Sequence, residues 1–207
     1  MVFLAAAEIL TIFTGIILLI WRLQFIFPEF GFILLGILVL TLLVHRDGWR
    51  NLGFGSHGFV SGMKALFAPT MILSMGFVLG GMAFGAFRGH HSILNWTMLS
   101  GFSRYFAWCL FQQFGLQSFF TNRIIQVLKN SRRTAWTAGA IFAAFHIPNP
   151  VLMPLTFFGG VILTRVFIRH RNLVPLALAQ AVIGTLTSIT IPPCWHHGLR
   201  VGPGYYQ

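Results

Sequence analysis

The chain has 207 residues, of which 56% are hydrophobic and only 8% charged, and its mean hydropathy is +0.78. A soluble domain carries about 25% charged residues, so this chain has too few to cover its surface in water. Its formal charge of +11 does not indicate nucleic-acid binding, because the basic residues lie between apolar runs and form no basic-aromatic face. Composition therefore excludes a soluble protein and predicts an integral membrane protein.

Apolar segments predict an all-α bundle. In chain order we expect helices over residues 2–20, 30–44, 64–87, 96–128, 134–147, 151–168 and 174–191. Most approach the roughly 20 residues that a helix needs to cross hydrocarbon. The first segment lacks the basic region and cleavage site of a signal peptide, so we expect it to be retained. Pro148 and Pro150 end a short fifth segment, which is either a full span or part of a re-entrant hairpin. The prediction is a polytopic membrane protein with about seven transmembrane helices.

The basic residues between these segments predict an orientation. If successive segments cross the membrane in alternating directions, ten basic residues fall on the same side: Arg46, Arg50, Lys64, Arg123, Lys129, Arg132, Arg133, Arg165, Arg169 and Arg171. The other side receives Arg22, Arg88 and Arg200, while Arg104 falls inside a segment. By the positive-inside rule the N-terminus is cytoplasmic and the extramembrane tail, residues 192–207, is outside. We expect one membrane domain, residues 1–207, in a bacterial inner (cytoplasmic) membrane.

Uncharged polar side chains inside the apolar segments are the candidate functional residues, because such groups need partners in hydrocarbon. They are Gln112, Gln113 and Gln117 in the fourth segment, His146 at the end of the fifth, and Gln180 in the seventh. A rise of about 1.5 Å per residue, counted from one side, places the three segments' polar residues at a similar depth. Two interpretations stay open: hydrogen bonds that hold helices together, and a binding or catalytic pocket.

The spacing of these residues follows three motifs. The first reads Gln112-Gln113-Phe114-Gly115-Leu116-Gln117, the second Phe142-Ala143-Ala144-Phe145-His146 with Ile147-Pro148-Asn149 after it, and the third Gln180-Ala181-Val182-Ile183-Gly184. They resemble the Glu-Glu-x-x-x-Arg, Phe-x-x-x-His and His-x-x-x-Asn motifs of the CAAX prenyl protease and bacteriocin-processing family of intramembrane peptidases. Residues 46–54 resemble the amphipathic segment that precedes that family's core, so the likeness covers about residues 46–191.

The resemblance implies an intramembrane protease scaffold, but this chain has glutamines at most of the catalytic positions. An amide does not take up a proton, so Gln112 and Gln113 cannot act as general bases. An arginine without its carboxylates would be a costly unpaired charge in the membrane. The replacement of both the glutamates and the arginine of the first motif by glutamine is therefore electrostatically consistent. The leading hypothesis is a non-proteolytic pseudoenzyme that binds a hydrophobic ligand (an isoprenoid lipid or a pigment) or acts as a subunit of a membrane complex. Its expected ligand pocket comprises Gln112, Gln113, Gln117, Phe142, His146, Asn149 and Gln180.

The alternative hypothesis is a divergent intramembrane peptidase or other membrane enzyme. Its catalytic residues would be His146, Gln112, Gln113 and Gln180. In this hypothesis His146 carries the proton, and Gln112 or Gln180 stabilises an oxyanion.

The sequence requires no cofactor, and we assign no metal site. The remaining candidates for a metal ion or for the metal of a tetrapyrrole are His90, His91, Cys194, His196 and His197. Their spacing gives no tetrahedral motif, and His and Trp at an interface also anchor helix ends. The expected partners are membrane lipids, other membrane-protein subunits or a hydrophobic ligand, and no nucleic acid.

Overall fold

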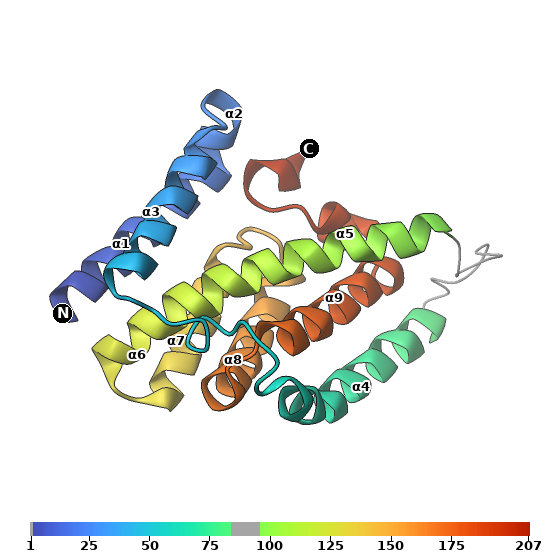
Figure 1. Ribbon diagram of the computed structural model, residues 1–207. Coiled ribbons are helices and arrows are strands. Elements are labelled where there is room, and N and C mark those ends of the chain that lie inside the picture. The colour runs from blue at the N-terminus through green and yellow to red at the C-terminus, as the bar shows by residue number, and fades with distance from the viewer. Residues whose placement is uncertain (1, 84–95) are drawn as a thin grey trace.

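The computed structural model describes residues 2–83 and 96–207, and every regular element in these two ranges is a helix (Figure 1). The helices are α1 (Val2–Leu18), the π-helix η1 (Leu19–Leu23), α2 (Gln24–Ile26), α3 (Phe30–Val44), α4 (Phe59–Ala83), α5 (Trp96–Gln113), the π-helix η2 (Phe114–Thr121), α6 (Asn122–Leu128), α7 (Ser131–Ala144), α8 (Leu152–His170), α9 (Leu173–Thr190), α10 (Pro193–His196), and the 3-10 helices η3 (His197–Leu199) and η4 (Gly202–Tyr206). The all-helical prediction is confirmed. His90, His91 and Arg88 lie outside the described residues.

Four helical stretches within the described ranges are long and apolar enough to cross a membrane: Val2–Ile26, Phe59–Ala83, Leu152–His170 and Leu173–Thr190. The apolar helix α3 is shorter. In the most apolar window of each stretch, 50% of residues are buried in α9 but only 17% in α1–α2 and α4, so α9 is central and the other two are peripheral. The predicted count of about seven crossings stays a prediction.

Helix pairing builds the molecule around α9, which packs against both α4 and α5. The helices α7 and α8 form a close antiparallel pair (Figure 1). A Cβ atom added to Gly160 would lie 2.9 Å from the Cα of Gly139, so small residues permit this approach. The C-terminal residues return to η1, where a Cβ on Gly202 would lie 2.8 Å from Ile20.

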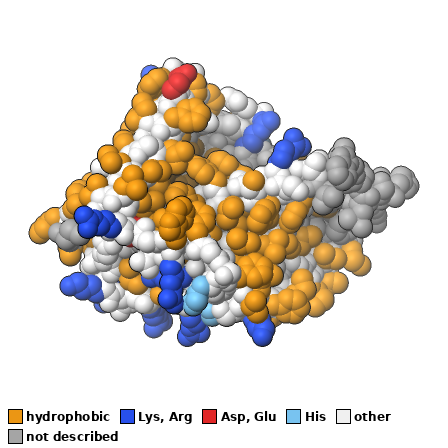
Figure 2. Space-filling model, viewed as in Figure 1, with side chains coloured by type: hydrophobic (Ala, Val, Ile, Leu, Met, Phe, Trp, Pro, Cys, Tyr) orange, Lys and Arg blue, Asp and Glu red, His pale blue; other side chains and the backbone are white. Residues whose placement is uncertain are grey.

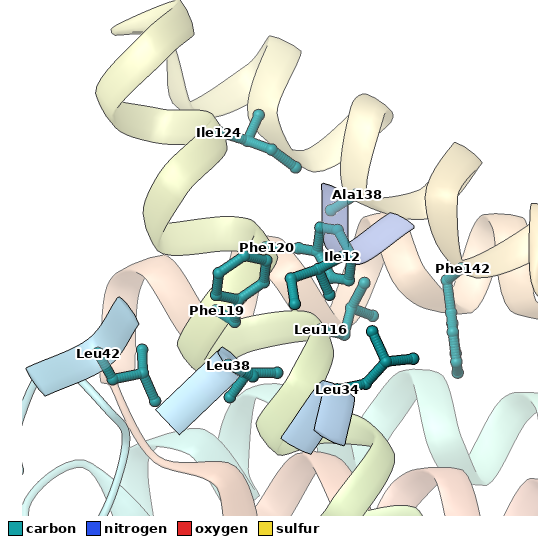
Figure 3. Packing of buried hydrophobic residues seen from close by; sticks show 10 residues of the cluster. All are labelled: Ile12, Leu34, Leu38, Leu42, Leu116, Phe119, Phe120, Ile124, Ala138 and Phe142. Atoms are coloured by element: carbon teal, nitrogen blue, oxygen red, sulfur yellow. The ribbon is translucent and has the colours of Figure 1, made fainter. Parts of the chain in front are cut away.

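The N-terminal hairpin of α1 and α3 packs on η2 and α6 through a buried apolar cluster (Figure 3). Leu34 and Leu38 from α3 and Ile12 from α1 meet Leu116 and Phe120 from η2. A π-helix makes a wider turn than an α-helix, and such segments frequently occur at functional sites. This packing places the hairpin directly beside the segment that carries the glutamine motif.

A buried ion-pair cluster fixes the same hairpin at the other end of η2. The side chain of Arg123 in α6 is fully buried, and its Nε donates to Glu8 Oε2 at 2.9 Å. Its Nη2 donates to the carbonyl oxygen of Thr41 at 3.1 Å and lies 2.8 Å from Asp47 Oδ2, an ion pair without aligned hydrogen-bond geometry. His45 Nε2 lies 3.0 Å from the other Glu8 oxygen. Arg123, Glu8, Asp47 and His45 form what we name the charge cluster.

Side chains of the core also hold the irregular connection between α3 and α4. Ser118 donates to the carbonyl oxygen of Leu52 at 2.6 Å, and Asn122 donates to that of Asn51 at 3.0 Å. Asn172, the N-cap of α9, donates to the carbonyl oxygen of Gly55 at 2.7 Å. The segment that resembles the family's amphipathic region is therefore bound to η2, α6 and α9.

Figure 2 shows basic side chains gathered along the edge where α6 joins α7 and where α8 ends, next to a broad hydrophobic surface. Lys129, Arg132, Arg133 and Arg169 lie in these segments. This arrangement is typical of a helix bundle whose charged rim lies at a membrane–water interface.

We predict that Arg123→Ala destabilises the folded protein by about 3–5 kcal/mol, because it leaves two mostly buried carboxylates without their arginine. Thermal unfolding of the purified protein in mild detergent measures the effect. Arg132→Ala removes an exposed arginine at the start of α7 and should change stability by less than about 0.5 kcal/mol. Equal stability of the two variants would contradict a stabilising role for the charge cluster.

Candidate functional site

The glutamine motif lies where α5 gives way to η2. Gln112 and Gln113 end α5, and Gln117 lies in the second half of the motif within η2. Gln113 and Gln117 are fully buried, whereas Gln112 is partly exposed. Gln180 lies in α9, which packs against α5. The two helices therefore bring the first and third motifs together.

These residues form one continuous run of hydrogen bonds, which we name the amide chain. Thr121 Oγ1 donates to Gln117 Oε1 at 2.9 Å, and Gln117 Nε2 donates to Gln113 Oε1 at 3.0 Å. Gln113 Nε2 donates to Gln180 Oε1 at 2.7 Å, and Gln180 Nε2 donates to Gln112 Oε1 at 2.6 Å. Every link has the same direction, from Thr121 toward Gln112. Amide and hydroxyl groups thus satisfy one another without any charge.

The chain ends on the side-chain nitrogen of Gln112. This nitrogen donates to no protein group within residues 2–83 and 96–207, and Gln112 lines a large cavity. Hydrogen bonds that follow one another in a single direction polarise each other, which strengthens the last donor. Gln112 therefore presents an N–H donor to the cavity.

His146 presents the complementary group. It follows α7, its residue is 8% exposed, and its Nδ1 lies 2.7 Å from the carbonyl oxygen of Phe142. A carbonyl oxygen only accepts, so Nδ1 carries the proton and Nε2 of the neutral ring is an acceptor. The Phe142 ring meets the imidazole edge to face, with centroids 4.9 Å apart. His146 also lines the cavity, and no hydrogen bond links it to the glutamines among the described residues.

The cavity has a volume of about 1940 Å³, which exceeds the roughly 300–1,000 Å³ of ordinary ligand pockets. Its walls come from the α1–α3 hairpin, α4, α5, α8, α9 and the C-terminal residues. The lining is predominantly apolar. It includes no Asp, Glu or Lys among the described residues, and its polar groups include Gln112, His146, Gln180 and Arg200.

The third motif departs from the family at Gly184, and the structure gives a steric reason. A Cβ atom on Gly184 would lie 2.1 Å from the hydroxyl oxygen of Tyr105 and 2.8 Å from two of its ring carbons. Tyr105 thus occupies the space that a larger side chain at residue 184 would need. The motif's asparagine does not fit here unless Tyr105 moves.

Asn149, which the sequence placed in the pocket, does not line the cavity. It is fully buried, its Oδ1 accepts from the backbone of Val151 and Leu152 at the start of α8, and its Nδ2 donates to the carbonyl oxygens of His196 and Arg200. These contacts hold the C-terminal residues on the turn between α7 and α8. Among the residues expected in the pocket, Gln112, Phe142, His146 and Gln180 line the cavity. Gln113 and Gln117 lie behind them in the amide chain.

Among the metal candidates, His196 uses both ring nitrogens: Nε2 lies 3.1 Å from the carbonyl oxygen of Ile191, and Nδ1 accepts from the backbone of Leu199 at 3.2 Å. His197 packs against Tyr205 with ring centroids 4.3 Å apart, and Cys194 is exposed. In the part of the chain that the structure describes, no three His, Cys, Asp or Glu side chains are grouped to hold a metal ion.

Sequence reasoning missed two members of this region. Thr121 extends the amide chain, and its spacing of four residues from Gln117, like that of Gln117 from Gln113, was the signal available. Tyr105 carried no comparable signal, because its role depends on the contact between α5 and α9.

Comparison with known proteins agrees with the motifs. Residues 109–186 match the family model of the type II CAAX prenyl endopeptidases, described as Rce1-like. The matched segment contains the glutamine motif, His146 and Gln180. No curated protein and no solved structure gave a match.

The site combines a predominantly apolar cavity with the amide donor of Gln112 and the imidazole acceptor of His146. Peptide hydrolysis by general base catalysis needs a group that removes a proton from water. Amide side chains cannot do so, which leaves His146 as the lining group whose ordinary pKa is nearest neutrality. The arrangement is suited to hydrogen-bonding an uncharged molecule.

We predict that Gln113→Glu destabilises the protein by at least about 3 kcal/mol, because it introduces a buried carboxylate without a cation. One of its oxygens would also face the oxygen of Gln180 that now accepts from Gln113. The double variant Gln113→Glu/Gln117→Arg should recover part of the loss, since residues four apart on a helix can pair.

Chemical or thermal unfolding in detergent measures both variants. Gln126→Glu, on α6 and only partly buried, is the matched control and should stay close to the wild type. If Gln113→Glu were as stable as the control at neutral pH, the amide chain would not require neutrality.

Proposed function

We propose that this chain is a non-proteolytic member of its family that binds a hydrophobic ligand, such as an isoprenoid lipid or a pigment. One observation carries the proposal: a large, predominantly apolar cavity is lined by the neutral amides of Gln112 and Gln180 and by the imidazole of His146. The volume of about 1940 Å³ is large enough for a long chain or a fused ring system.

The proposed lack of proteolysis rests on the chemistry of the polar side chains in and next to the cavity lining. The glutamine motif supplies hydrogen bonds where the family's first motif supplies carboxylates. Gln180 takes the position of the histidine in the family's third motif. The amides of Gln113 and Gln180 are also engaged with each other at 2.7 Å. A water molecule placed there would find no side chain of the amide chain able to take its proton.

We further propose about seven crossings with a cytoplasmic N-terminus and the tail, residues 192–207, outside a bacterial inner membrane. The gathering of Lys and Arg along the edge of α6, α7 and α8 supports this orientation (Figure 2). A role as a subunit of a membrane complex is compatible with the outer surface of the bundle, because exposed apolar side chains cover much of it.

A second candidate function is a membrane enzyme that uses His146 as its proton carrier. The orientation of the ring favours it, because Nδ1 is held by Phe142 and Nε2 is left to accept a proton. It predicts hydrolysis of a prenylated peptide that His146→Ala abolishes. Under the binding proposal, neither the wild type nor the variant cleaves such a peptide.

We predict that native mass spectrometry of protein extracted in mild detergent detects a bound small apolar molecule. Gly159→Phe should remove it, because Gly159 lines the cavity and a Cβ there has nothing within 4 Å. Gly36→Phe is the matched control: it also points into open space but lies outside the cavity lining. Retention by Gly36→Phe and loss by Gly159→Phe is the expected pair. A wild type that carries only a protein partner would favour the subunit role instead.

We predict that a membrane-impermeant maleimide labels Cys194 in intact bacterial spheroplasts, because this exposed cysteine lies in the tail that we place outside. Cys109 is buried and should not react, so Cys194→Ser is the negative control. Labelling that appears only after the spheroplasts are lysed would reverse the proposed orientation.

A further inference from the structure

The direction of the hydrogen bonds made by Gln112 and His146, which line the cavity, restricts which ligand fits it. We infer that the cavity selects a long apolar molecule that ends in an uncharged hydroxyl group. This inference rests on the proposed binding function and adds the chemistry of the ligand's polar end to it.

The donor is the Gln112 side-chain nitrogen. Its amide oxygen already accepts from Gln180 at 2.6 Å, and Gln180 in turn accepts from Gln113 at 2.7 Å. These bonds fix which end of the Gln112 amide remains available to the cavity. A ligand atom next to Gln112 must therefore accept a hydrogen bond.

The acceptor is Nε2 of His146. The contact of 2.7 Å between Nδ1 and the Phe142 carbonyl oxygen places the proton of the neutral ring on Nδ1. A ligand atom next to Nε2 must donate. Gln112 and His146 line the same cavity. A hydroxyl group that reaches both accepts from Gln112 through its lone pairs and donates its proton to His146, either directly or through one water molecule.

Charged end groups are disfavoured at this position. The lining contains no Asp, Glu or Lys among the described residues, and its arginine, Arg200, is exposed in the C-terminal segment. The buried Arg123 is unsuited to bind a ligand, since Glu8 and Asp47 pair with it. A carboxylate or phosphate beside Gln112 would lose its hydration without a cation in return. Ethers and hydrocarbons carry no charge, but they leave the His146 acceptor without a donor.

The test measures competition at the full-length protein in nanodiscs, with tritiated hexadecan-1-ol as the tracer. Competitors share its chain and differ only at the end: hexadecan-1-ol, its methyl ether, hexadecane and palmitate. We expect the alcohol to compete about tenfold better than the ether and the hydrocarbon, the effect of one hydrogen bond. Palmitate should be weaker than the alcohol at neutral pH.

Variants locate the preference. Gln112→Leu and His146→Leu should each reduce the advantage of the alcohol about tenfold and leave hexadecane unchanged. Gln24→Leu is the matched control: Gln24 also lines the cavity, but its amide nitrogen already donates to the carbonyl oxygen of Ile20. It should not alter the order of the competitors.

The outcomes separate this inference from the proposed function. Equal competition by all four molecules, blocked by Gly159→Phe, would overturn the hydroxyl preference and leave ligand binding intact. Tightest competition by palmitate, lost in Arg200→Ala, would overturn the inference in favour of an anionic end group held by Arg200. Tracer binding that is absent, or insensitive to Gly159→Phe, would contradict the binding function itself.

Discussion

The burial of Arg123 is the constraint on which the arrangement of this chain depends. A guanidinium that is withdrawn from water needs carboxylates close by, and Glu8 in α1 and Asp47 after α3 lie 2.9 and 2.8 Å from it. The N-terminal hairpin is therefore held against α6 and η2. That hairpin forms one wall of the cavity, so the charge cluster determines where the wall stands.

Charge and neutrality are separated along the same continuous helix. Arg123 in α6 carries the ion pairs, whereas Gln117, Gln113 and Gln112 earlier in the chain form the amide chain. Because Glu8 and Asp47 are committed to Arg123, neither carboxylate lies in the lining of the cavity. Neutral amides can be buried at low cost when each finds a hydrogen-bond partner. Here each amide donates to the oxygen of the next amide in the chain.

Much of this could be predicted from the sequence. Long apolar segments identified the helices, and the spacing of Gln112, Gln113, His146 and Gln180 identified the region that the family model matches. The joining of Gln180 to Gln112 and Gln113 needed the packing of α9 on α5, which no local pattern specifies. Glu8 and Arg123 are 115 residues apart, so their pairing was equally beyond sequence reasoning. Asn149 looked like part of the pocket because it follows His146 closely, but its amide holds the C-terminal residues.

The central claim is that the apolar cavity lined by neutral amides and one imidazole holds an apolar ligand and is not a hydrolytic centre. An electron cryomicroscopy map of the protein in lipid nanodiscs tests it most directly. The account predicts elongated density along the cavity that ends within hydrogen-bond distance of the Gln112 side-chain nitrogen, with the amide chain intact. A cavity closed by the α1–α3 hairpin, or a metal ion bound between His146 and the glutamines, would contradict it.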